Sequence, residues 1–213
     1  MSGLEQAATW LLGRPLTEAD GVPPAAIEAA EACMGARAPA ALKALYLAVG
    51  EETTLMSAFQ QFLPVAGWEV FDGKLLFLEE NQGVCVWAAD SSGRVFQTED
   101  PAASEWFEEP CGLDDFLHAV LYYQMAEGGY PFAGNLPAAN FADVEAVESF
   151  IAKRGGERVV DLVGLRVHRV GEQALVWYLH DGACVDDGGV FLSTLTEQTY
   201  LRVAQVWGFE DLD

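Results

Sequence analysis

The side chains best suited to chemistry lie in the C-terminal third of the sequence. His168 and His180 fall on two neighbouring predicted strands, and three carboxylates follow the second of them, at Asp181, Asp186 and Asp187. Imidazole nitrogens and carboxylate oxygens are ligands for divalent metal ions. Their spacing fits no established ligand pattern, however, and two aspartates followed by two glycines are typical of a turn. A metal-binding enzyme is therefore only an alternative, and we expect no cofactor.

Nucleophilic catalysis has no support in the residue pattern. None of the serines with hydrophobic surroundings, Ser57, Ser149 and Ser193, lies in a Gly-x-Ser-x-Gly elbow. No cysteine has a basic neighbour that would lower its pKa, and no glycine pair is followed by the Lys-Ser/Thr of a phosphate loop. We therefore expect that the protein is not an enzyme.

Acidic residues greatly outnumber basic residues in this chain. The 213 residues include 33 acids and 11 lysines and arginines, for a formal net charge of −22 at pH 7. No lysine or arginine occurs from Val95 to Ala152, a span that holds eleven acids. This balance disfavours nucleic acids and anionic membranes as partners, and it permits a basic protein partner. The alternative is that the charge serves only solubility.

The candidate partner-binding surface combines carboxylates with an aromatic anchor. Trp106 and Phe107 lie between Glu105 and the pair Glu108-Glu109, and aromatic anchors among charges are typical of protein interfaces. The alternative is that both aromatics fill the edge of the core and the carboxylates surround them in solvent. The residues that we assign to this surface are Glu51, Glu52, Glu79, Glu80, Glu105, Trp106, Glu108, Glu109, Asp114 and Asp115.

These residues are positioned by a predicted central hairpin. Two apolar runs, 75–78 and 84–89, are separated by a polar turn that ends in Gly83, where we expect a positive φ. A second hairpin is predicted at Asp72-Gly73, and a further strand at 94–98. Apolar residues at helical spacing predict helices over 24–34, over 42–49 and after Asp114, and a short helix from Leu55 that ends at Pro64.

Residues 35–127 resemble the SUKH superfamily of bacterial immunity proteins. The resemblance rests on a helix led by Pro39 that ends at Gly50, on the strand-turn-strand 77–87, on the strand at Val95-Phe96 and on the closing helix at Phe116-Leu117. It implies a mixed helix-and-sheet domain that binds a protein toxin and catalyses nothing. The expected function is therefore an immunity protein that neutralises a cognate toxin domain, such as a basic nuclease. The alternative is a regulatory or scaffold module that binds a cellular protein.

The glycine- and proline-rich stretch 128–140 marks the best domain boundary. We expect a SUKH-like domain over 1–130, a linker over 128–140 and a smaller α+β lobe over 141–213, with a helix over 143–154, four strands and a helix over 197–207. The fold class is α+β, with a central, mostly antiparallel sheet and flanking helices. The four scattered cysteines, the absence of a basic leader and the absence of a long apolar run favour a cytoplasmic protein.

Overall fold

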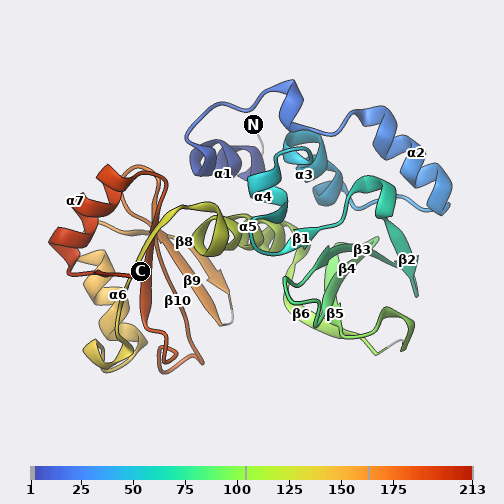
Figure 1. Ribbon diagram of the computed structural model, residues 1–213. Coiled ribbons are helices and arrows are strands. Elements are labelled where there is room, and N and C mark those ends of the chain that lie inside the picture. The colour runs from blue at the N-terminus through green and yellow to red at the C-terminus, as the bar shows by residue number, and fades with distance from the viewer. Residues whose placement is uncertain (1–2, 104, 163, 213) are drawn as a thin grey trace. The chain divides into compact units, whose positions relative to one another are not determined.

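The computed structural model describes residues 3–103, 105–162 and 164–212, and it confirms the α+β class (Figure 1). The chain divides into two compact units, Met1–Gln124 and Met125–Asp213. Each unit combines helices with an antiparallel sheet. Among the described residues, no helix has the length and apolar character needed to cross a membrane.

The sheet of the first unit has five antiparallel strands in a row and a short sixth strand that pairs with β3. The strand order is β1-β3-β4-β5-β6, and β2 also pairs with β3. The strands are β1 (Gln61–Phe62), β2 (Glu69–Phe71), β3 (Lys74–Glu79), β4 (Val86–Asp90), β5 (Arg94–Thr98) and β6 (Phe107–Gly112). The helices are α1 (Gly3–Leu12), α2 (Pro24–Met34), α3 (Ala40–Val49), α4 (Thr53–Ser57) and α5 (Leu113–Gln124).

Both predicted hairpins are present in the first sheet. Asp72 and Gly73 have φ values of 49° and 74°, and they join β2 to β3 in a two-residue turn that needs positive φ at both positions. Gly83 has the expected positive φ, 71°, in the turn between β3 and β4. These two strands lie in the middle of the sheet, as the apolar runs predicted.

Helix α5 packs its apolar side against the first sheet. Leu117 and Leu121 are fully buried, and the ring of Phe116 meets that of Phe77 on β3 edge to face, with ring centroids 6.0 Å apart. The buried side chain of Gln124 then fixes the end of α5 to the chain before β1, because its amide accepts from the N–H of Gln60 at 2.6 Å and donates to the carbonyl oxygen of the same residue at 2.6 Å. The helix is thereby fixed at both its face and its end.

Two predictions for the chain between elements are wrong. The helix expected from Leu55 to Pro64 ends at Ser57, and Phe62 instead belongs to β1, which pairs with β3. The stretch 128–140, expected to be a linker, contains β7 (Phe132–Leu136), which pairs with β11 over five residues. In both cases a strand pairing overrides the local signal, which was helical spacing in the first case and turn-forming residues in the second.

The second unit has a six-stranded sheet in the order β12-β7-β11-β10-β9-β8. Beside β7, its strands are β8 (Glu157–Leu162), β9 (Leu165–Arg169), β10 (Ala174–Leu179), β11 (Val190–Thr194) and β12 (Glu210–Asp211). Its helices are α6 (Val144–Ala152) and α7 (Glu197–Trp207). The side chain of Asp143 caps the start of α6 by accepting from the N–H of Ala146 at 2.8 Å.

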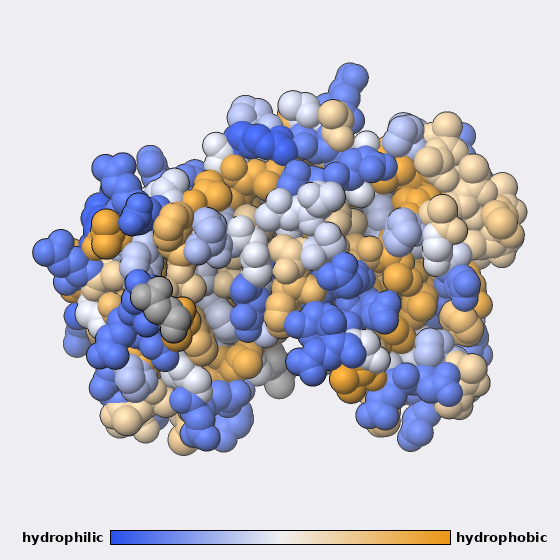
Figure 2. All heavy atoms as spheres, viewed as in Figure 1, coloured by the Kyte–Doolittle hydropathy of each residue, from blue (hydrophilic) through white to orange (hydrophobic). Residues whose placement is uncertain are grey.

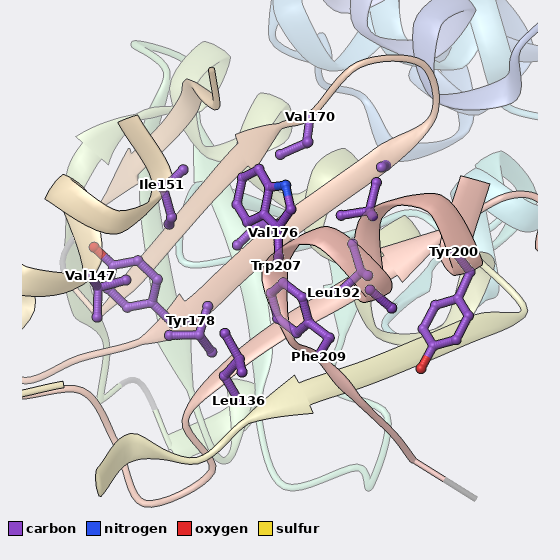
Figure 3. Packing of buried hydrophobic residues seen from close by; sticks show 14 of the residues in the cluster. Leu136, Val147, Ile151, Val170, Val176, Tyr178, Leu192, Tyr200, Trp207 and Phe209 are labelled. Atoms are coloured by element: carbon purple, nitrogen blue, oxygen red, sulfur yellow. The ribbon is translucent and has the colours of Figure 1, made fainter. Parts of the chain in front are cut away.

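Helices α6 and α7 enclose a core on one face of this sheet (Figure 3). Val176 and Tyr178 project from β10 into this core, where Ile151 of α6 and Trp207 of α7 are also buried. Burial of such side chains contributes roughly 1.5–3 kcal/mol each. The alternation along β10 leaves its other residues for the opposite face of the sheet.

Candidate partner-binding surface

Strand β6 is an edge strand of the first sheet and carries two of the ten predicted residues, Glu108 and Glu109, directly after Glu105 and Trp106. It pairs with β5, with Phe107 opposite Gln97 and Glu108 opposite Phe96. An edge strand presents unpaired backbone groups, and charged side chains are a usual protection against unwanted pairing. The carboxylates of Glu105 and Glu108 are exposed beside this edge.

Two loops meet at one end of the sheet. Because β3, β4, β5 and β6 are successive antiparallel strands, the 80–85 turn and the 99–106 connection leave the sheet at the same end. Each brings an apolar side chain close to solvent: Val84 is 59% exposed in the first turn, and Phe107 is 63% exposed just after the second connection. Neither loop contains a lysine or an arginine.

Several of these carboxylates act on two cysteine thiols. Burial raises the pKa of the Cys85 thiol, and the negative charges of Glu80, Glu109 and Glu99 raise it further. The pKa of the Cys111 thiol is also raised, first by burial and then by Glu109 and Asp115. The charges that act on the two thiols therefore come from the turns after β3 and β5, from β6 and from α5. We call the following set the β6 edge: Glu80, Val84, Glu99, Glu105, Phe107, Glu108, Glu109 and Asp115.

Three acids of the β6 edge also hold the structure together. Glu80 accepts from the N–H groups of Gln82 and Val84 and so fixes the turn that presents Val84. Glu109, which is half-buried, accepts from the Trp87 indole N–H at 2.8 Å. Glu108 lies 3.6 Å from the Arg94 guanidinium, in an exposed pair. Glu99 and Glu105 are the exposed carboxylates best placed to meet a partner.

Trp106 has a different environment from its neighbour Phe107. Its ring is half-buried, and the ammonium of Lys74 lies 5.3 Å from its centroid and 5.0 Å from that of Phe96. This packing matches the alternative in which Trp106 covers the edge of the core. The exposed aromatic of the pair is Phe107.

The remaining predicted acids are spread over the first unit. Glu52 lies 3.4 Å from the Arg14 guanidinium and caps α4 by accepting from the N–H of Thr54, so its contacts are with the helices. Glu51 precedes it and is exposed. Glu79 is half-buried at the end of β3, opposite Gln61. Asp114 is exposed in the first turn of α5, where a negative charge favours the helix N-terminus.

Figure 2 shows that hydrophilic residues cover much of the molecular surface in this view and alternate with smaller hydrophobic areas. Exposed acids also occur elsewhere on the chain, for example Glu28, Glu172 and Glu210. What distinguishes the β6 edge is that two exposed apolar side chains, Val84 and Phe107, lie in segments that are rich in acids.

The two histidines singled out in the sequence do not meet as metal ligands. His168, on β9, is 2% exposed and its Nε2 lies 3.2 Å from Glu148 of α6. His180 instead uses Nδ1 to accept from the N–H of Gly182 at 3.0 Å. Over 3–103, 105–162 and 164–212, no group of three or more His, Cys, Asp or Glu side chains is placed to hold a metal ion.

Glu148 has several polar contacts and was not among the candidate site residues predicted from the sequence. It receives a hydrogen bond from the Tyr178 hydroxyl and lies near the guanidinium groups of Arg158 and Arg166, at 3.6 and 3.7 Å. Burial lowers the pKa of His168, although the Glu148 carboxylate acts in the opposite direction. The sequence feature that could have pointed to Glu148 is its position next to the apolar face of α6, one residue after Val147.

Comparison of the chain with models of protein families, with curated proteins and with solved structures yields no match. The assignment of function therefore depends on the residues and their arrangement.

Proposed function

We propose that this protein binds a basic protein through the β6 edge, and that it acts as an immunity protein that neutralises a toxin domain. The observation that carries the binding proposal is the exposure of Phe107 on the edge strand β6, next in sequence to the exposed acid Glu108 and close to Glu105. The immunity role is supported by the resemblance of residues 35–127 to the SUKH superfamily.

The carboxylates and the apolar side chains contribute to binding in different ways. Carboxylates such as Glu99 and Glu105 attract a basic partner over distance and raise the rate of encounter. Phe107 and Val84 offer apolar area that is lost from water only when the partner arrives, and this burial slows dissociation. A nuclease toxin fits this surface because its own site must attract phosphates. Occupation of that site by acids would block the substrate.

A cytoplasmic location belongs to the same proposal. The four cysteines are all free thiols, which suits a reducing compartment.

Site-specific photo-crosslinking tests the binding proposal. A benzoylphenylalanine side chain placed at Phe107 should trap a basic protein in the source cells. The same group at Val206, which is 69% exposed on α7, is the matched control. Equal trapping at both positions, or trapping at Val206 alone, would contradict the proposal.

Expression of the trapped partner separates immunity from the alternative regulatory or scaffold role. A toxin domain should arrest growth when it is expressed alone, and co-expression of this protein should restore growth. A partner that is harmless when expressed alone would favour the regulatory or scaffold role.

A further inference from the structure

A cavity of about 630 Å³ lies in the second unit, on the face of the sheet away from the core in Figure 3. Its walls come from β10, β11 and the turn that joins them, together with Glu127. Successive strand residues point to opposite faces, so Val176 and Tyr178 enter the core while Trp177 and Leu179 line the cavity.

One wall of the cavity is a rigid aromatic pair. Trp177 and Phe191 lie opposite each other on β10 and β11, with ring centroids 4.5 Å apart and planes 19° apart. The Trp177 indole N–H donates to the Ser193 hydroxyl at 3.1 Å, and that hydroxyl donates to the Ala126 carbonyl at 2.6 Å. The indole is therefore held in place, and because it is only 3% exposed it supports the half-buried Phe191 ring, which is the more accessible of the two.

The turn opposite this wall depends on two glycines. Gly189 has φ 86°, and a Cβ there would lie 2.1 Å from the Leu136 carbonyl oxygen. A Cβ on Gly188 would lie 2.9 Å from the ring of Phe191. Glycine at both positions lets the turn approach the aromatic wall closely and carry Asp186 and Asp187 to the rim of the cavity.

All the charged residues that line the cavity are acidic. Its lining includes the carboxylates of Glu127, Asp181, Asp186 and Asp187, and none of its lining residues is a lysine, an arginine or a histidine. Asp181 accepts from the N–H groups of Ala183 and Cys184 and so shapes the turn. An aromatic wall with carboxylates at its rim suits a planar cation, because a guanidinium stacks on a ring face while its N–H groups donate to carboxylates.

We propose that this cavity binds an arginine side chain of a basic protein. The inference extends the proposed function to the second unit and rests on it only for the class of partner. The recognition chemistry is a guanidinium against the half-buried ring of Phe191, which the buried Trp177 supports, with hydrogen bonds to the aspartates that line the cavity. A lysine ammonium carries the same charge but has no planar face to stack, and it should bind more weakly.

Two-dimensional NMR of the full-length protein tests this with the blocked peptide acetyl-Gly-Gly-Arg-Gly-amide. Titration should shift the Trp177 indole signal and the amides of Gly188 and Gly189. The same peptide with lysine should bind more weakly, and that with neutral citrulline should produce no shift. The Asp186→Asn/Asp187→Asn variant should weaken the arginine peptide by about tenfold, since two charged hydrogen bonds lose their acceptor charge.

The control variant Glu105→Gln/Glu108→Gln removes the same charge from the β6 edge and should leave these shifts unchanged. Equal weakening in both variants, or equal binding of arginine and citrulline peptides, would overturn the cavity proposal. Shifts confined to the β6 edge would also overturn it, but they would leave the proposed function standing.

Discussion

At the scale of single residues, His168 shows how a side chain suited to chemistry is used in packing. Its ring is buried on β9 and faces Glu148, whose carboxylate is also close to Arg158 and Arg166. Burial opposes the charged imidazolium more strongly than Glu148 favours it, so the pKa of His168 is lowered. The folded protein thus resists protonation of this group.

This lowered pKa predicts a pH-dependent stability. The unfolded chain, with an ordinary histidine pKa of 6.5, binds the proton more readily than the folded chain. His168 should therefore make the free energy of unfolding fall as the pH drops below about 6.5, and the effect should be absent at higher pH. Urea unfolding at about pH 7.5 and about pH 5 should show a smaller acid-induced loss for His168→Gln than for the wild type. Equal losses would show that His168 does not contribute.

Gly189 gives a second prediction at this scale. Both Gly189 and Gly155 have positive φ, at 86° and 79°, but the space around a Cβ at Gly155 is open, whereas one at Gly189 meets the backbone of Leu136. Gly155→Ala should lower the free energy of unfolding by about 1–2 kcal/mol through backbone strain alone. Gly189→Ala should lose a further 1–3 kcal/mol or so through the collision. Equal melting temperatures for the two variants would contradict this packing.

At the scale of elements, the sequence predicts those whose signals are local. The bounds of α2, β5, β10 and α7 agree with the predicted ranges, because caps, prolines, glycines and hydrophobic periodicity mark their ends. Strand β7 could not be predicted from such local signals. Gly134 within it is required because a Cβ there would lie 2.5 Å from the Glu210 carbonyl oxygen of β12, a neighbour remote in sequence.

The same limit applies to the candidate site. The acidity of the segment around Glu105 and Glu108 follows from the sequence, but the environments of Trp106 and Phe107 do not. They depend on the register of β6 against β5, which places Phe107 opposite Gln97 and exposes its ring, while Trp106 packs near Lys74. One step along a strand exchanges the two faces of a sheet.

The two neighbouring aromatics of this element should respond differently to truncation. Trp106→Ala removes a half-buried ring that packs near Lys74 and should lower the free energy of unfolding by about 1–3 kcal/mol. Phe107→Ser removes an exposed ring and should change it by no more than about 0.5 kcal/mol. Thermal or urea unfolding measures both. A larger loss for Phe107→Ser would reverse the assignment of the exposed anchor.

At the scale of the whole molecule, the effect of the net charge of −22 on binding must be distinguished from the effect of where the charges lie. Net charge alone attracts any basic protein, whereas a localised surface attracts it to one place. Reversal of Glu99, Glu105 and Glu108 to lysine changes the charge of the β6 edge. Reversal of Glu28, Glu172 and Glu210, which are also exposed, changes the net charge by the same amount elsewhere.

The measurement that tests the central claim most directly is the association rate of the photo-crosslinked partner with these two variants. The Debye length falls from about 30 Å at 0.01 M salt to about 8 Å at 0.15 M, so wild-type association should slow over this range. The β6-edge reversal should slow association strongly at low salt and weaken its salt dependence, and the control should resemble the wild type. Equal slowing by both variants would contradict a localised β6 edge.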